Sequence, residues 1–428
     1  MEDRGFELRT RLEALERDDN RSLSPADRVA ERAYFAPPSG GDLPVLEGEE
    51  ALVFGSNNYL GLTTDERVQR AATQACETVG TGAGSSRLWT GDTLVHHDLE
   101  RALAETTGTD RTLVCSSRHA AITGAITTLE PDVIFADERT NAGLADACRL
   151  VGADCITYDH CNASSLRAQM ERRGVSSGTS TAVSTEPVIE NGGERGANGA
   201  EESWLVVTDS AFGADGTVAP LEDLCIVAET VGAWVLVDET HATGLYTGGG
   251  GIVQATGVED RVHVQIGALS TALASQGGFV AGEADLIEVL LACGRPFTFE
   301  AGLAPPAAAA ASEALHITRH SDCRERLWEN VAHCREGLEA MGLEVLGETQ
   351  ILSVRLEAPE LAPALAAELR ERGVIVPAIV PPAVPNGTSC LRVTPMATHD
   401  PEDIVACLEA IQAAREAVGT PGGNKPLE

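Results

Sequence analysis

The residues with the clearest chemical potential follow a buried strand near the middle of the chain. The apolar run Trp234–Val237 is typical of such a strand, and Asp238 and His241 come directly after it. A second short strand, over residues 262–266, leads into Thr271. Open α/β sheets bind ligands at the carboxyl ends of their strands, so this stretch is a candidate site. Taken alone, Asp238 and His241 are better explained as a turn cap and a structural histidine. Whether they have a function therefore depends on the surrounding motifs.

Two motifs upstream favour the functional interpretation. Ser56-Asn57-Asn58-Tyr59-Leu60-Gly61 follows a short strand, and the glycine-rich segment 80–91 precedes a helix that contains His96, Leu99 and Glu100. Each motif is a weak signal by itself. Together, in this order and upstream of Asp238, they resemble the α-oxoamine synthases, fold-type I pyridoxal phosphate enzymes that include 8-amino-7-oxononanoate synthase and 2-amino-3-ketobutyrate ligase.

The resemblance implies both a fold and an activity. The expected fold is α/β and fold-type I aminotransferase-like, with a mostly parallel seven-stranded sheet in a large domain and a small α+β C-terminal domain. The expected activity is that of an acyltransferase, which condenses an amino acid with an acyl-CoA and uses pyridoxal phosphate as cofactor. Members of the family are dimers.

The resemblance also assigns roles to single residues. Asp238 would pair with the pyridine nitrogen of the cofactor, and His241 would contact the ring hydroxyl. Arg392 would bind the carboxylate of the amino acid, and Arg87 would reach the substrate across the dimer. The other cofactor contacts that the resemblance implies are Arg118, His119, Asn141, Asp209 and Ser270.

The main departure from the family is Thr271, which stands where the family has the lysine that holds the cofactor as a Schiff base. Threonine has no amine, and the only lysine of the chain is Lys425, in the tail. Further departures replace a stacking histidine, a phosphate-loop glycine and a ring-side serine by Asn141, Arg118 and Gly213, and a Tyr-Ser-Thr segment by Phe299-Glu300-Ala301.

These departures leave two functional interpretations open. In the first, the cofactor site is degenerate and the chain is a non-catalytic protein, either a homodimer or one half of a heterodimer with a lysine-bearing paralogue. Serine palmitoyltransferase offers an analogy, because one subunit of that heterodimer lacks the lysine and supports the other. The alternative is an active pyridoxal phosphate-dependent acyltransferase of the 8-amino-7-oxononanoate synthase type. We expect the first, because the departures gather at the cofactor.

Composition limits the class of partner. The 428 residues include 65 acidic and 31 basic ones, a net charge of −34, so neither nucleic acid nor an anionic membrane is an expected partner. Dispersed acid with a single lysine predicts a halophilic, cytoplasmic protein. The eleven cysteines form no CxxC pair. Cys155 and Cys161 lie close to His160, but we expect reduced thiols rather than a metal site.

The pattern along the chain predicts the following organisation: an N-terminal helix and arm over residues 1–45, a large domain over 46–290 with a flexible insertion at 174–203, a small C-terminal domain over 291–418, and a disordered tail over 419–428.

Overall fold

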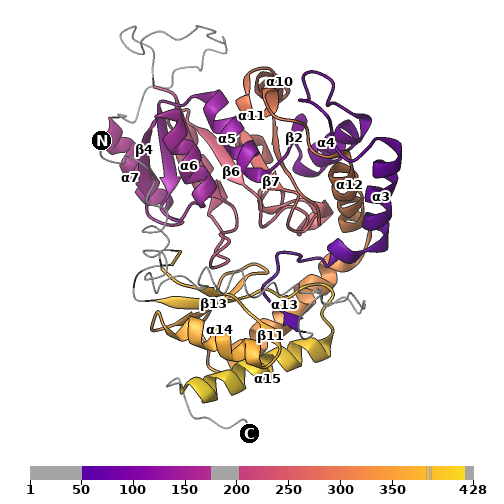
Figure 1. The fold of residues 1–428 in the computed structure, drawn as a ribbon. Coiled ribbons are helices and arrows are strands. Elements are labelled where there is room, and N and C mark those ends of the chain that lie inside the picture. Colours follow the sequence, from indigo (N-terminus) through magenta and orange to yellow (C-terminus); the bar gives the residue numbers. More distant parts are fainter. Residues whose placement is uncertain (1–50, 175–201, 382, 385, 387, 420–428) are drawn as a thin grey trace, which may run out of the picture. The chain divides into compact units, whose positions relative to one another are not determined.

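The computed structural model describes residues 51–174, 202–381, 383, 384, 386 and 388–419 (Figure 1). The predicted N-terminal helix and arm lie outside the described residues, as do nearly all of the predicted insertion and tail. The described chain forms two compact units. The larger unit comprises residues 62–213 and 218–324, and the smaller one comprises residues up to 61, 214–217 and those from 325 onward.

The larger unit is built on one sheet of seven strands. In spatial order these are β2 (Arg111–Cys115), β8 (Gly278–Gly282), β7 (Val264–Ala268), β6 (Trp234–Asp238), β5 (Trp204–Asp209), β3 (Val133–Asp137) and β4 (Asp154–Tyr158). Strand β8 is antiparallel to both of its neighbours, and every other pair is parallel. The predicted, mostly parallel seven-stranded sheet is therefore confirmed.

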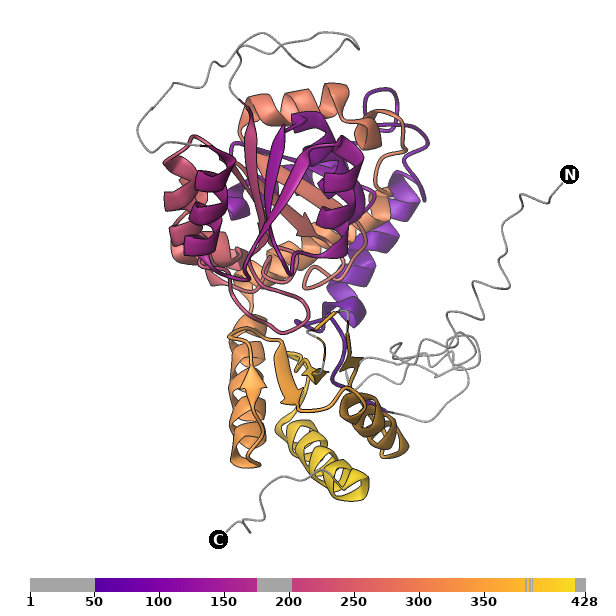
Figure 2. The ribbon, with the colours of Figure 1, turned by 90° about the vertical axis from the view of Figure 1, so that its left-hand side faces the viewer.

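Helices cover both faces of this sheet, as Figure 2 shows. On one face lie α5 (Arg118–Leu129), α6 (Ala142–Val151), α10 (Ala284–Cys293) and the short α11 (Arg295–Thr298). On the other face lie α7 (Ala163–Arg173), α8 (Leu221–Glu229) and α9 (Ile252–Thr256). Strand residues alternate between the two cores: Leu236 packs with α5 and α6, whereas Val235 and Val237 pack on the other side. Because both faces are buried, the strands are apolar throughout, which is why they were recognisable in the sequence.

Three further helices complete the larger unit. α12 (Pro305–His320) packs against α3 (Glu66–Thr78) and α4 (Leu94–Thr107). Short 3₁₀ turns lie at Leu62–Thr64, Thr247–Gly249 and Glu259–Arg261. None of the described helices is long and apolar enough to span a membrane.

The smaller unit is α+β. Its antiparallel sheet has the order β12 (Ala378–Ile379), β13 (Ser389–Val393), β10 (Leu352–Leu356) and β9 (Val345–Leu346), and β1 (Leu52–Val53) pairs in parallel with β11 (Val374–Ile375). Its helices are α14 (Leu361–Glu371), α15 (Pro401–Val418) and most of α13 (Cys323–Ala340). Residues 51–61 fall in this unit and residues 291–324 in the larger one. The compact units thus differ from the division into domains made from the sequence, which stays a prediction.

Candidate cofactor site at the carboxyl ends of the central strands

Two carboxylates lie side by side where β5 and β6 end. The two strands are parallel, and their register pairs Asp209 with Asp238. By strand alternation both side chains point to the sheet face covered by α5 and α6, the face on which Val207 and Leu236 are buried. The side chain of Asp238 is 0% exposed, and that of Asp209 is nearly as buried. Two buried negative charges at this spacing require a neutralising partner.

Arg118 supplies the positive charge. It is the first residue of α5, whose N-cap is Ser117. Its guanidinium donates two hydrogen bonds to Oδ2 of Asp238, from Nε at 2.9 Å and from Nη2 at 2.6 Å. The same Nη2 lies 3.8 Å from Oδ1 of Asp209. Arg118 thus forms charge-assisted hydrogen bonds with Asp238 and a longer ion pair with Asp209.

Asn141 links the two carboxylates from the start of α6. Its Nδ2 donates to Oδ1 of Asp209 at 2.8 Å and to Oδ2 of Asp238 at 3.1 Å, and its backbone N–H donates to Asp209 at 3.2 Å. Its side-chain oxygen caps the helix by accepting the N–H of Leu144. His119 is exposed and, within the described part of the chain, makes no hydrogen bond to this group.

The electrostatics of the site are dominated by burial. Burial, and then the negative charge of Asp238, raise the pKa of Asp209 to about 7, against the opposing effect of Arg118 and of the hydrogen bonds from Asn141. Glu239 follows Asp238 in the sequence and is also buried, which raises the pKa of its carboxyl to about 7. Burial thus raises the pKa of two carboxyl groups here, one at the end of β5 and one directly after β6.

Three other predicted site residues lie on the segments that follow β6 and β7. His241 is half-buried, and its ring lies against Gly213, where an added Cβ would stand 2.9 Å from the ring Cδ2 and closer still to Nε2. The hydroxyl of Thr271 donates to the carbonyl of Thr240 at 2.9 Å. Ser270 is exposed. The structure therefore brings His241 and Gly213 together, and it pairs the Thr271 hydroxyl with a backbone carbonyl.

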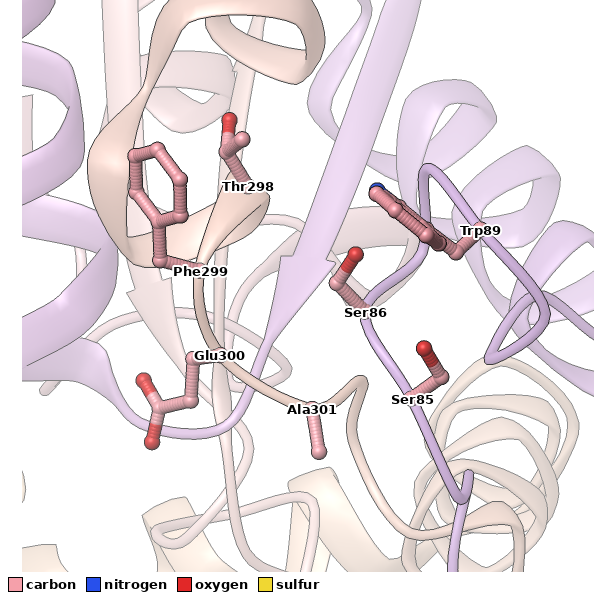
Figure 3. Close-up of a pocket in the computed structure, with 7 residues that line it drawn as sticks. All are labelled: Ser85, Ser86, Trp89, Thr298, Phe299, Glu300 and Ala301. Carbon is pink, nitrogen blue, oxygen red and sulfur yellow. The ribbon is translucent and has the colours of Figure 1, made fainter.

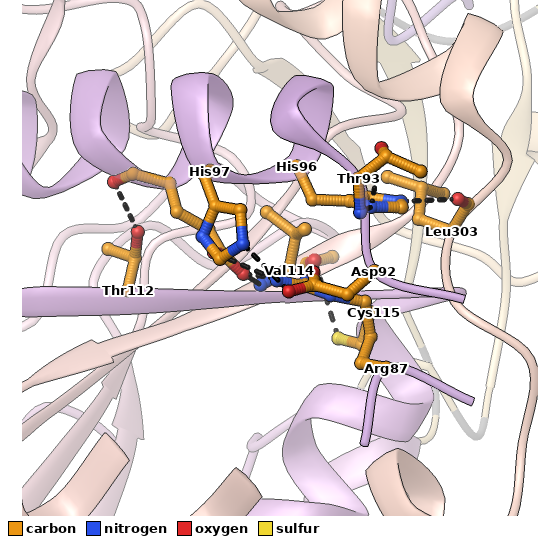
Figure 4. Close-up of polar contacts among 11 residues, drawn as sticks. Arg87, Asp92, Thr93, His96, His97, Thr112, Val114, Cys115 and Leu303 are labelled. Carbon is orange, nitrogen blue, oxygen red and sulfur yellow. Dashed lines mark hydrogen bonds and ion pairs between the residues drawn. The ribbon is translucent and has the colours of Figure 1, made fainter. Parts of the chain in front are cut away.

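Arg87 is held by two carboxylates of the larger unit, of which Figure 4 labels Asp92. It donates to both oxygens of Glu100, at 2.7 and 3.1 Å, and to Asp92 at 2.5 Å. Glu100 also accepts the backbone N–H of Val114 at 3.0 Å. His96 is buried and lies 2.6 Å from the carbonyl oxygen of Leu303. The substrate role of Arg87 stays a prediction, and the guanidinium is already neutralised in this conformation.

Arg392 belongs to the smaller unit, on β13. It is buried, and its Nη2 lies 3.1 Å from Oδ1 of Asn57 and 3.3 Å from the hydroxyl of Tyr59. Burial raises the pKa of Tyr59, and the positive charge of Arg392 opposes the shift. Asn57 and Tyr59 come from the Asn-containing motif singled out in the sequence, so this motif and Arg392 are neighbours. The predicted contact of Arg392 with a substrate carboxylate stays a prediction.

The cysteine and histidine cluster noted in the sequence lies on the opposite face of the sheet from Arg118. Asp137, His160 and Cys161 place three potential metal ligands within 4.8 Å of one another. Asp137 already accepts hydrogen bonds from the backbone N–H of Cys161 at 2.8 Å, and its Oδ1 lies 2.9 Å from Nδ1 of His160. Cys161 Sγ lies 3.5 Å from Nε2 and 3.7 Å from Nδ1, which places the thiol beside the ring face rather than along a ligand direction. These groups are linked by hydrogen bonds, and the expectation of reduced thiols rather than a metal site stays a prediction.

A pocket of about 290 Å³ opens elsewhere on the larger unit, as Figure 3 shows. Trp89 and Phe299 line it and are 80% and 74% exposed. The remaining lining residues are Ser85, Ser86, Thr298, Glu300 and Ala301. Glu300, from the segment that stands where the resemblance expects Tyr-Ser-Thr, is thus part of the lining of this pocket.

Comparison with known proteins decides the family. The family described as aminotransferase class I and II matches residues 49–411. An 8-amino-7-oxononanoate synthase from Geobacter metallireducens is 37% identical over 388 residues, which cover 89% of this chain and 93% of that protein. The chain belongs to the α-oxoamine synthase family of fold-type I pyridoxal phosphate enzymes.

Other relatives agree with this assignment. An 8-amino-7-oxononanoate synthase from Stutzerimonas stutzeri is 38% identical over 397 residues, covering 90% of this chain and 94% of that protein. The solved structure of a serine palmitoyltransferase from S. paucimobilis with a bound pyridoxal phosphate–myriocin aldimine superposes with a TM-score of 0.81 at 29% identity, over 92% of this chain and 94% of that one. The predicted fold-type I class is thereby confirmed.

The residues of this chain do not fit the cofactor of the family. The oxygens of Asp238, which would accept the pyridine N–H, already accept hydrogen bonds from Arg118, Asn141 and the backbone N–H of Thr240. Thr271 offers no amine, and its hydroxyl is bonded to a backbone carbonyl. The family depends on pyridoxal phosphate, whereas in the described part of this chain Thr271 stands at the expected lysine position and Arg118 is hydrogen-bonded to Asp238, the carboxylate expected to meet the cofactor ring.

Sequence reasoning included Arg118 among the cofactor contacts and missed its partner. A signal was present, because a buried aspartate without a cofactor cation needs another cation nearby. The resemblance expected a glycine at position 118, and Arg118 is the residue that brings the positive charge to the site. Nothing in the spacing of residues 118 and 238 showed that the two side chains meet.

Proposed function

We propose that this chain is a non-catalytic member of the α-oxoamine synthase family that acts as a partner subunit. The observation that carries the proposal is Thr271 in the place of the Schiff-base lysine. The Thr271 hydroxyl donates a hydrogen bond to the carbonyl of Thr240. Lys425, the only lysine in the sequence, lies outside the described residues. Within the described residues, therefore, no lysine amine is present for the covalent attachment of the cofactor on which the chemistry of the family depends.

An exposed apolar surface supports a second subunit as the partner. Trp89 and Phe299 stand on either side of the pocket in Figure 3, and Leu88 and Leu94, which are close to Trp89 in the sequence, are exposed as well. Large exposed apolar side chains that gather in one region mark interaction sites. We infer that a lysine-bearing relative covers this surface.

The competing proposal is an active acyltransferase that uses an amino acid and an acyl-CoA. Its support is the similarity to proteins named 8-amino-7-oxononanoate synthase, at 37% and 38% identity over most of the chain. An amino acid can form an imine with free pyridoxal phosphate without a lysine, so this route does not need Thr271 to react. It does need the ring to reach Asp238.

Two measurements separate these proposals. The purified chain is mixed with pyridoxal phosphate, an amino acid and an acyl-CoA, and release of free CoA is followed; a lysine-bearing relative serves as the positive control. The partner-subunit proposal predicts no release above the protein-free rate. The tagged chain is then isolated from its source organism, and we expect a lysine-bearing relative in the complex at equal stoichiometry. Turnover by the isolated chain would reject the proposal and support the active enzyme.

A further inference from the structure

The buried carboxylates at the ends of β5 and β6 have their counter-ion within this chain. Oδ2 of Asp238 accepts two hydrogen bonds from Arg118, at 2.9 and 2.6 Å, and one from Asn141 at 3.1 Å. Oδ1 accepts the backbone N–H of Thr240 at 2.9 Å. Both oxygens are therefore engaged by donors of the chain itself, although the carboxylate is fully buried.

A protonated pyridine ring and a guanidinium are alike in the features that matter at this place. Both are flat cations that donate N–H groups to a carboxylate, and both are stabilised by a buried negative charge. In the family the aspartate serves the ring. Here the guanidinium of Arg118 stands at hydrogen-bond distance from the same oxygen, so a ring nitrogen cannot approach it while Arg118 stays.

We propose that Arg118 is a resident cation that replaces the cofactor ring at Asp238, and that pyridoxal phosphate and the Arg118 side chain compete for this one carboxylate. The inference goes beyond the proposed function, because it concerns the isolated chain whether or not that chain pairs with another subunit.

The local backbone holds Arg118 in position. The side chain of Ser117 caps α5 by accepting the N–H of Ala120 at 3.0 Å. The backbone of Arg118 packs on Gly278 of β8, where an added Cβ would lie 2.5 Å from the Arg118 Cα. The Arg118 side chain is 27% exposed, so solvent reaches it and it has a way out of the site. An ordinary surface ion pair would not explain the arrangement, because its acidic partner is completely buried.

Replacing Arg118 tests the counter-ion role through stability. The variants are Arg118→Met, which keeps the length of the side chain without its charge, and Arg118→Gly, which empties the position. The matched control is Arg101→Met, since Arg101 is exposed and paired with exposed Asp98. We expect both Arg118 variants to lower the thermal midpoint by roughly 5 °C or more, and the control by about 1 °C or less.

Added guanidinium ion then tests whether the lower thermal midpoint of these variants is due to the missing cation. At millimolar guanidinium chloride, a concentration that leaves the wild-type midpoint unchanged, the Arg118→Gly variant should recover part of its midpoint, because the free cation enters the vacated place. Sodium chloride at equal ionic strength should have less effect. An Arg118→Gly variant as stable as wild type, or one that guanidinium does not restore, would overturn the proposal.

Cofactor competition gives a second readout. Equilibrium dialysis should show that Arg118→Gly binds pyridoxal phosphate at least roughly tenfold more tightly than wild type. Equal affinity would contradict the competition. If the single variants do not fold, the double variant Arg118→Met/Asp238→Asn should fold again, since it removes both charges; a double variant that also fails to fold counts against the counter-ion role. The partner-subunit proposal is judged separately, by co-purification.

Discussion

Asp209 carries the most strongly perturbed carboxyl group of the cofactor site, and its replacement gives a prediction with a definite sign. Burial, followed by the charge of Asp238, raises its pKa from an ordinary value of 3.8 to about 7. A carboxyl group with a higher pKa in the folded state binds its proton more tightly when the chain is folded. Its contribution to the free energy of unfolding is therefore greatest in acid and is lost as the pH rises toward 7. About 3 pKa units at about 1.4 kcal/mol each give roughly 4 kcal/mol.

The variant Asp209→Asn removes this dependence. The carboxamide oxygen still accepts the hydrogen bond from Asn141, but it carries no charge at any pH. Relative to wild type, the variant should therefore gain about 2–4 kcal/mol of unfolding free energy between about pH 5 and about pH 8. Urea unfolding at the two pH values measures it, with Asp98→Asn as an exposed control. A wild-type-to-variant difference that is the same at both pH values would refute the reasoning.

Three further predictions concern the lost tether, the close packing at the imidazole, and the charge of the surface. Thr271→Lys alone should not form a Schiff base with pyridoxal phosphate, as measured by absorbance, because Arg118 still fills the ring position. The double variant Thr271→Lys/Arg118→Gly should form one. Schiff-base formation by the single variant would contradict the role given to Arg118. Gly213→Ala should lower the unfolding free energy by about 1–3 kcal/mol, because the new methyl group overlaps the His241 ring, whereas Gly82→Ala, with nothing near the added atom, should change it by less. With a net charge of −34, wild type should gain stability from low to molar potassium chloride, and a midpoint independent of salt would argue against the halophilic assignment.

The fold was predictable because its signals are local. The apolar run ending at Val237 has the composition of a strand buried on both faces, and the residue after it, Asp238, lies at the strand end where ligands bind in such sheets. The resemblance set Gly213 and His241 beside one ring, and in the structure these two residues are in contact. Periodicity and motif order were sufficient for these points.

The electrostatic pairing of the site was not predictable in the same way. Arg118 and Asp238 are 120 positions apart, and no sequence pattern specifies that a particular arginine reaches a particular carboxylate. Arg87 is similar, since its pairing with Glu100 depends on how the glycine-rich segment folds back on α4. A side chain that replaces a cofactor contact can be recognised only when the positions of both side chains of the pair, such as Arg118 and Asp238, are known.

The central claim is that this chain does not hold pyridoxal phosphate covalently, and the mass of the intact protein tests it most directly. The purified chain is incubated with pyridoxal phosphate, reduced with borohydride, unfolded and weighed by mass spectrometry, beside a lysine-bearing relative. We expect this chain to gain no phosphopyridoxyl group, by intact mass and by the masses of the peptides around Thr271, whereas the relative gains one per chain. A stoichiometric adduct on a residue close to Thr271 would contradict this claim.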